Sequence, residues 1–331
     1  MSTMLAIEVE NLTKEFNGFV AVDHISFSIE SGEAFGLLGP NGAGKTTTMS
    51  MLSTMLKPTS GKASVHDFDI LKEQDDVRKS IGIVFQDQSL DEELTAYENM
   101  DFHGRLYRIP KNLREKKIKE LLKLVELEDK KDNLVKTYSG GMRRRLEIAR
   151  GLMHEPKVLF LDEPTLGLDP QTRNHLWNYI DRLNKEKGIT IVLTTHYMEE
   201  ADKLCDRIAI IDKGKIIALD SSEKLKESIG GDVIEIIPSN KEKLYSMIKA
   251  FSWVKRVDIH NDYVTINLQN AEKHVAEIVN VAYDNGIGIE SISIHKPTLE
   301  DVFLYYTGRT MREEEASSKD RMRMARRSQR R

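Results

Sequence analysis

Residues 39 to 46 read Gly39-Pro40-Asn41-Gly42-Ala43-Gly44-Lys45-Thr46. This octapeptide matches the phosphate-binding pattern G-x-x-x-x-G-K-[ST] at every fixed position. It follows an apolar run, residues 34–38, and precedes a segment that we expect to be helical, residues 47–56. A strand, a glycine loop and a helix N-terminus in this order are the context in which the pattern binds phosphate.

The residues of this loop suit phosphate for distinct physical reasons. Glycine lacks a Cβ, so the loop turns tightly and directs backbone N–H groups at phosphate oxygens. The following helix adds the positive end of its dipole. We expect Lys45 to reach the β- and γ-phosphates, Thr46 to ligate Mg²⁺, and Thr47 to complete the contacts. A glycine-rich turn with a chance lysine is the alternative, and the strand–loop–helix context disfavours it. The chain is therefore predicted to bind a nucleotide.

Composition limits the class of protein. The chain has 331 residues, which suits two domains, and a net charge of -4, which implies no general attraction to nucleic acid or membrane. No apolar run approaches the roughly 20 residues that span a bilayer, and the N-terminus lacks the features of a secretion signal. The single cysteine, Cys205, excludes an internal disulfide and a cysteine-based metal site. We expect a cytoplasmic protein that another chain would have to bring to a membrane.

The first predicted domain, residues 5–225, combines three patterns. Alternating apolar and polar residues across 7–29 predict antiparallel strands. Apolar runs at 158–161, 189–194 and 208–211 suit a buried parallel sheet. Residues 95–135 show helical spacing with no strand signal. The prediction is an α/β fold with a mixed sheet, an antiparallel β subdomain and a helical subdomain.

A second, smaller domain is predicted over residues 232–308, after a boundary near Gly230-Gly231. Its pattern is strand, helix, two strands joined by a hairpin, helix and strand, which is the α+β ferredoxin-like order. Residues 309–331 form a basic tail, dense in arginine from 319 onward. We expect this tail to be disordered and solvated; electrostatic contact with anionic lipid or RNA is the alternative.

Two further segments narrow the choice among nucleotide-binding proteins. Residues 138–145 read Tyr-Ser-Gly-Gly-Met-Arg-Arg-Arg, and residues 159–164 read Leu-Phe-Leu-Asp-Glu-Pro. With the phosphate loop, these motifs resemble the ATP-binding subunits of ABC transporters, in that family's order and spacing. The resemblance covers residues 5 to about 220. It implies a P-loop NTPase fold and hydrolysis of ATP with Mg²⁺.

The resemblance implies roles for individual residues around the nucleotide. Asp162, at the end of an apolar strand, would hold Mg²⁺ through water, and Glu163 would polarise the attacking water. The segment Ser139-Gly140-Gly141 would face the γ-phosphate held by a partner subunit, so that two chains close head to tail around two nucleotides. One departure is Met142, which stands where the family usually has Gln.

Four more residues are assigned by the same resemblance. Gln86 would sense Mg²⁺ and the helical subdomain, and His196 would contact the γ-phosphate. Asp169, in the segment 167–170, would contact the opposite subunit. Phe16 would stack on adenine, although core packing is nearly as plausible and Phe19 is a competing candidate. Without the surrounding motifs, Gln86 and His196 would be read as ordinary surface and structural residues.

Segments 86–99, 138–149 and 297–304 resemble the daunorubicin- and multidrug-resistance exporter branch of the family. This implies a homodimer or a pair of related ATPases, on the inner face of the cell membrane, with a separate permease and no specific nucleic acid. The alternative is a soluble ABC ATPase of translation or DNA repair. The single phosphate loop, the absence of long heptads and the single cysteine disfavour it.

Overall fold

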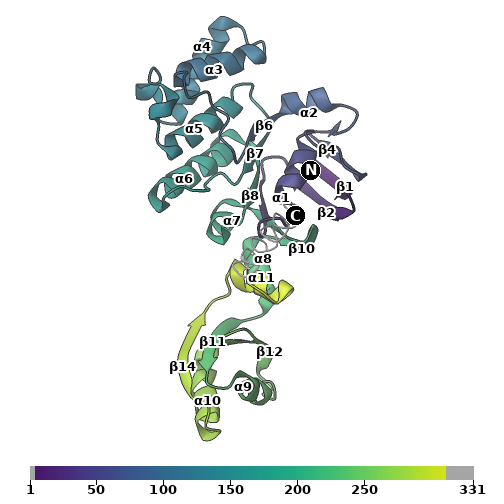
Figure 1. The fold of residues 1–331 in the computed structure, drawn as a ribbon, viewed down its shortest axis with the longest axis vertical. Coiled ribbons are helices and arrows are strands. Elements are labelled where there is room, and N and C mark those ends of the chain that lie inside the picture. Colours follow the sequence, from purple (N-terminus) through teal and green to yellow (C-terminus); the bar gives the residue numbers. More distant parts are fainter. Residues whose placement is uncertain (1–3, 311–331) are drawn as a thin grey trace, which may run out of the picture. The chain divides into compact units, whose positions relative to one another are not determined.

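The computed structural model describes residues 4–310 (Figure 1). This part of the chain forms two compact units, the first ending at Leu219 and the second beginning at Asp220. Each unit has a hydrophobic core of its own. None of the helices between residues 4 and 310 has the length and apolar character needed to cross a membrane.

The first unit opens with an antiparallel sheet of order β2-β1-β4-β5. Its strands are β1 (Leu5–Phe16), β2 (Phe19–Glu30), β4 (Ser60–Val65) and β5 (Phe68–Asp69). Strands β1 and β2 form a hairpin in which Phe16 pairs with Phe19. The two connecting residues, Asn17 and Gly18, both have positive φ, the conformation that a tight hairpin turn requires. The predicted antiparallel strands are confirmed.

The second sheet of this unit has six strands in the order β10-β9-β3-β8-β7-β6. Their bounds are β3 (Ala34–Leu38), β6 (Ile81–Val84), β7 (Val158–Asp162), β8 (Thr190–Thr195), β9 (Arg207–Asp212) and β10 (Lys215–Asp220). Strands β9, β3, β8, β7 and β6 pair in parallel, and every residue of β3, β7 and β8 is buried. Parallel strands end at one edge of the sheet, so the segments after β3, β6, β7 and β8 meet there.

Seven α-helices accompany these sheets: α1 (Lys45–Leu52), α2 (Gln74–Ser80), α3 (Ala96–Leu106), α4 (Lys111–Leu124), α5 (Gly140–Gly151), α6 (Pro170–Lys187) and α7 (Met198–Leu204). A capping box between Thr95 and Glu98 begins α3, and Gly188, with φ of 63°, ends α6. Helices α3 and α4 lie in the segment 95–135 that was predicted to be helical, and α5 follows them before β7.

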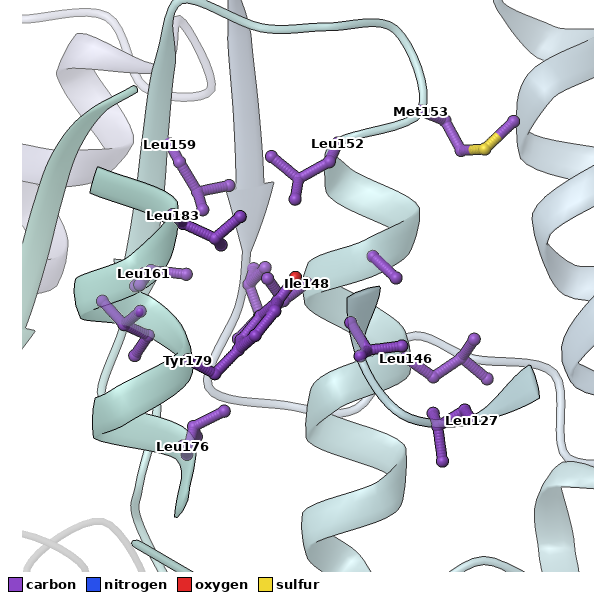
Figure 2. Close-up of a cluster of buried hydrophobic side chains, with 14 of the residues drawn as sticks. Leu127, Leu146, Ile148, Leu152, Met153, Leu159, Leu161, Leu176, Tyr179 and Leu183 are labelled. Atoms are coloured by element: carbon purple, nitrogen blue, oxygen red, sulfur yellow. The ribbon is translucent and has the colours of Figure 1, made fainter. Parts of the chain in front are cut away.

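Helices α5 and α6 pack against each other and against β7 through a dense apolar cluster (Figure 2). The labelled side chains that share it include Leu146, Ile148, Leu152, Leu159, Leu161, Leu176, Tyr179 and Leu183. Each Å² of apolar surface removed from water stabilises the fold by roughly 25 cal/mol. This burial fixes the position of α5 relative to the sheet. The position of α5 matters for function because its first residues belong to the serine-glycine motif.

The second unit is built on an antiparallel sheet of order β12-β13-β11-β14. Its elements are β11 (Asp232–Pro238), α9 (Lys241–Ile248), β12 (Val254–Ile259), β13 (Val264–Leu268), α10 (Ala271–Asp284) and β14 (Ile289–His295). The core is formed by one face of this sheet with α9 and α10, and it includes Ile234, Leu244 and Ile278. The strand–helix–strand–strand–helix–strand order is the predicted ferredoxin-like one.

The second unit starts earlier than the sequence predicts. The first predicted domain ends at 225, within the helix α8 (Ser222–Ile229), and the second begins at 232, after this helix. In the structure, α8 belongs to the second unit and packs against α11 (Leu299–Thr307). Gly230, with φ of 87°, is the C-cap of α8 and not a linker between domains. Of the predicted tail, 309–331, residues 311–331 lie outside the described part of the chain.

Candidate functional site

The phosphate loop lies between the buried strand β3 and helix α1, as predicted. Two of its glycines are required by their surroundings. A Cβ on Gly39 would lie 2.2 Å from the carbonyl oxygen of Ile211, and one on Gly44 would lie 2.6 Å from that of Ala21. Gly44 also has φ of 108° and is the N-cap of α1, so its left-handed conformation starts the helix.

Lys45, the first residue of α1, is buried and points back into the loop. Its Nζ donates to the carbonyl oxygens of Gly39 at 2.6 Å and Pro40 at 3.1 Å. The same Nζ lies 3.5 Å from Oε1 of Glu163. The loop thus holds a cation at its centre, where an anionic phosphate would be stabilised.

A cavity of about 360 Å³ opens beside the loop. It is lined by Phe16, Phe19, Ala21, Asn41, Gly42, Gly44, Lys45, Thr46, Thr47, Gln86 and Glu163. Its volume falls within the range of small-molecule sites, and its lining combines two aromatic side chains with the glycine loop and Lys45. These features fit a nucleotide, with its base against an aromatic ring and its phosphates against the loop.

Two hydroxyl groups and one carboxylate meet at the end of β7. Thr46 Oγ1 donates to Asp162 Oδ1 at 3.2 Å, and Thr194 Oγ1 donates to the same oxygen at 2.5 Å. Asp162 is 3% exposed, so its carboxylate is fixed by these bonds. A hydroxyl beside a carboxylate at the rim of a phosphate cavity is a suitable donor set for Mg²⁺, which prefers oxygen ligands and keeps several waters.

Glu163 follows directly and lies between two basic groups. Its Oε1 faces Lys45, and its Oε2 lies 3.1 Å from His196 Nδ1, close but not aligned as a good hydrogen bond. Burial by itself raises the pKa of Glu163, but contact with His196 and the charge of Lys45 outweigh burial and hold that pKa below its usual range. The carboxylate is therefore ionised at neutral pH and able to accept a proton.

The backbone of Glu163 is also unusual. Its φ is 45°, in the left-handed region that non-glycine residues seldom occupy. Its N–H donates to both the carbonyl oxygen and Oγ1 of Thr194, each at 3.1 Å. The neighbouring strand β8 thus holds a conformation that would otherwise relax.

The serine-glycine motif forms a different site. Ser139 is the N-cap of α5, and its Oγ accepts from Met142 N–H at 3.3 Å. A Cβ on Gly141 would lie 2.2 Å from Thr172 Cγ2, so glycine permits close packing of α5 on α6. Ser139, Gly141 and Met142 line a hollow of about 190 Å³ that shares no lining residue with the cavity at Lys45.

Comparison with known proteins decides the family. Residues 22–166 match the family model described as ABC transporter, and residues 221–307 match that of the C-terminal domain of DrrA1-3-like ATP-binding proteins. The linearmycin resistance ATP-binding protein of Bacillus subtilis (strain 168) is 40% identical over 311 residues, covering 93% of this chain and 100% of that protein. The chain belongs to the ABC transporter ATP-binding proteins.

Other relatives and solved structures agree. The daunorubicin/doxorubicin resistance ATP-binding protein of Streptomyces peucetius is 39% identical over 92% of both chains. The structure of cbiO1 from Clostridium perfringens, part of an ABC transporter complex, superposes with a TM-score of 0.64 at 33% identity, covering 68% of this chain and 93% of that one. A dimeric ATP-binding cassette with bound ADP and phosphate gives 0.58 at 29% identity, covering 65% and 98%.

The fold and reaction of this ABC ATPase follow from that membership. The first unit is a P-loop NTPase domain and the reaction is ATP hydrolysis, as predicted. The alternative, a soluble ATPase of translation or DNA repair, is not supported by the relatives, which carry resistance and export names.

The predicted site residues of the ABC ATPase fall into two groups. Phe16, residues 39–47, Gln86, Asp162, Glu163 and His196 gather at the carboxyl edge of the parallel strands. Ser139, Gly140, Gly141 and Asp169 lie elsewhere in the same chain. Asp169 is exposed and caps α6, accepting from Gln171 N–H at 3.1 Å and Thr172 N–H at 3.0 Å. Both Phe16 and Phe19 line the cavity, so the choice between them stays open.

Sequence reasoning missed Arg144, which is buried next to residues 162–164. Its guanidinium donates to backbone carbonyls before and after Glu163. The only sequence signal is weak: Arg144 and Glu147 stand three residues apart, which places them on one face of a helix.

Proposed function

We propose that the chain hydrolyses ATP in a head-to-tail dimer and thereby drives a compound out through a separate membrane permease. The observation that carries the proposal is the separation of the two phosphate-binding elements, because the Lys45 cavity and the Ser139 hollow have no lining residue in common. Two chains related by a twofold axis can bring the loop of one to the serine-glycine helix end of the other, twice.

Each residue at the Lys45 cavity has a part in hydrolysis under this proposal. The amides of the loop and Lys45 neutralise the β- and γ-phosphates as charge develops on them. Glu163, ionised between Lys45 and His196, accepts the proton of the attacking water. His196, 3.1 Å from Glu163, would contact the γ-phosphate.

Mg²⁺ is proposed as the metal of this site. Thr46 and Asp162 would hold it, with Gln86 lining the same cavity. A metal ion held by these residues would supply positive charge against the phosphates. The chain's own contribution is to fix the Asp162 carboxylate through hydrogen bonds from Thr46, which lines the cavity, and from Thr194.

The transported compound is proposed to be drug-like or otherwise hydrophobic. The relatives named for resistance to linearmycin, daunorubicin and doxorubicin match more than nine-tenths of this chain, including the second unit.

Within the helical subdomain, Phe102 and Leu106 of α3 and Leu113 of α4 are exposed apolar residues. We propose that they contact the permease, which would place the protein on the inner face of the membrane.

ATP-dependent dimerisation tests the proposal. The Glu163→Gln variant should bind ATP with Mg²⁺, hydrolyse it very slowly and accumulate as a dimer, measured by light scattering after size-exclusion chromatography. The matched control, Lys45→Ala with Glu163→Gln, should remain monomeric because the γ-phosphate is not held. A Glu163→Gln protein that stays monomeric at saturating ATP would contradict the head-to-tail site. Export itself is tested by co-purification of a polytopic membrane chain from solubilised membranes.

A further inference from the structure

The side chain of Arg144, in the first unit, contacts the backbone of residues 162–164, which includes Glu163. The residue is 7% exposed, on the second turn of α5. Its Nη2 donates to the carbonyl oxygens of Asp162 at 2.8 Å and Glu163 at 3.3 Å, and its Nε donates to that of Pro164 at 2.9 Å. Three successive carbonyls around the catalytic carboxylate are thus bound to one guanidinium.

The other side of the guanidinium reaches the segment around Gln86. Its Nη1 donates to the carbonyl oxygen of Phe85 and, at 2.9 Å, to Glu147 Oε2. Glu147 is 1% exposed, and its Oε1 accepts from Ser89 N–H at 2.8 Å. The Arg144–Glu147 pair therefore binds the backbone on both sides of Gln86.

This arrangement is demanding in chemical terms. Arginine carries five N–H donors in a planar fork, and here Nε, Nη1 and Nη2 all make hydrogen bonds, to five acceptors in total. The buried charge is balanced by Glu147. Lysine could reproduce the charge but not the planar set of bonds. A polar group this deeply buried and fully bonded fixes the segments that it joins.

Glu163 needs such a constraint. Its left-handed φ of 45° is strained for a residue with a Cβ, and strain of this kind persists only where the surroundings hold it. Thr194 holds its N–H from the β8 side, and Arg144 holds its carbonyl from the α5 side. The orientation of the carboxylate is thus tied to the position of α5, whose first residues are the serine-glycine motif.

We propose that Arg144, together with Glu147, is a positioning residue for ATP hydrolysis that links the serine-glycine end of α5 to Glu163 and to the Gln86 segment. A displacement of α5, when Ser139 engages a partner's nucleotide, reaches Glu163 through this one side chain. The inference rests on the catalytic role proposed above for Glu163.

A merely structural role for Arg144 predicts something different. Loss of a buried anchor alone would lower stability, with ATP binding and turnover reduced together as folded protein is lost. A positioning role separates the two. The five acceptors of Arg144 described above all lie outside the loop around Lys45, so ATP binding should survive while turnover falls.

The experiment compares the variants Arg144→Gln, Arg144→Lys and Glu147→Gln with a control, Arg182→Gln. Arg182 is a half-exposed arginine of α6 whose ion pair with Glu126 spans 3.9 Å. ATPase rates of the full chain are measured over a range of ATP concentrations, with the melting temperature of each variant. We expect Arg144→Gln to lower kcat about 10- to 100-fold with KM within about twofold. Arg144→Lys should recover only part of kcat, Glu147→Gln should show the same split more weakly, and Arg182→Gln should match the parent.

Several results would overturn the inference. One is an Arg144→Gln protein with parental kcat; another is a loss of kcat that merely parallels loss of folded protein. If Arg144→Gln does not fold, Arg144→Lys and Glu147→Gln carry the test, and a parental kcat in both would reject it. Failure of the underlying function is distinguishable, because brisk turnover by Glu163→Gln would remove Glu163 from catalysis whatever Arg144 does.

Discussion

Lys45 Nζ lies 3.5 Å from Glu163 Oε1, with both side chains more than nine-tenths buried. The Lys45 ammonium group thus contacts the Glu163 carboxylate and donates to two carbonyl oxygens of the loop. A γ-phosphate entering the cavity would compete with Glu163 for that ammonium. The same event that binds ATP would therefore release the Glu163 carboxylate toward the attacking water, which connects binding to catalysis through one pair of residues.

The first prediction concerns the charge of Glu163. Glu163→Gln should lower turnover by about 10²- to 10⁴-fold, the usual contribution of a general base. ATP affinity should be equal or higher, because the competing carboxylate no longer pairs with Lys45. Steady-state ATPase assays and equilibrium binding of a fluorescent ATP analogue measure the two effects. Weaker binding together with brisk turnover would contradict the competition.

The second prediction concerns Lys45 itself. Lys45→Ala should weaken ATP binding about 10- to 100-fold, because a charge-assisted contact to phosphate is worth roughly 1.5–3 kcal/mol. ADP and AMP provide the control: the loss should be smaller for ADP and smallest for AMP, which lacks the β- and γ-phosphates. Equal losses for all three nucleotides would mean that Lys45 does not contact these phosphates.

The third prediction tests the close packing of α5 on α6. Gly141→Ala places a methyl group 2.2 Å from Thr172 Cγ2, so the helices must separate or Thr172 must rotate. We expect a loss of about 1–3 kcal/mol in unfolding free energy and a reduced ATPase rate. Thr172→Ser removes the opposing methyl, so the double variant should regain stability in chemical denaturation. A double variant no more stable than Gly141→Ala would place the defect elsewhere.

The fourth prediction is a pH dependence of stability. Burial, with a smaller contribution from the charge of Arg150, lowers the pKa of His103 to about 4. In the unfolded chain, His103 therefore binds a proton below about pH 6.5. In the folded chain it binds one only below about pH 4. The stability that this residue contributes should be fully present above about pH 6.5 and should fall between pH 6.5 and 4, by on the order of 3 kcal/mol.

Replacement of His103 provides the check. His103→Phe should flatten the fall in melting temperature between pH 6.5 and 4, whereas replacement of the exposed His175 by Gln should leave it unchanged. An unaltered fall in the His103→Phe protein would assign the acid sensitivity to other groups.

The fold was accessible from the sequence wherever local patterns decide it. Largely apolar runs predicted the buried strands β7 and β8, and the glycine loop predicted the junction of β3 and α1, because these signals depend on neighbours along the chain. Gly230 misled the placement of the boundary, since a helix C-cap and a linker use the same residue. That α8 belongs with α11 depends on packing between segments about seventy residues apart.

The site was accessible to the extent that motifs carry it. The motif identified Glu163 but not its contacts with Lys45 and His196. These three residues follow the ends of three different strands, which meet only in the folded sheet. Arg144 could not be recognised, because its partners at 85 and 162–164 approach only after β6 and β7 pair. Asp169 acquires a role as helix cap that the motif did not indicate.

Complementation between two inactive variants tests the shared nucleotide site most directly. Lys45→Ala disables the loop, and Ser139→Asp keeps an N-cap residue while its charge repels phosphate. In a head-to-tail dimer of one chain of each kind, one site is doubly damaged and the other is intact. An equimolar mixture should therefore regain ATPase activity, up to about a quarter of that of the unmodified protein if the chains pair at random. A mixture as inactive as either variant alone, in chains shown to exchange partners, would mean that Lys45 and Ser139 do not act on one nucleotide across the dimer.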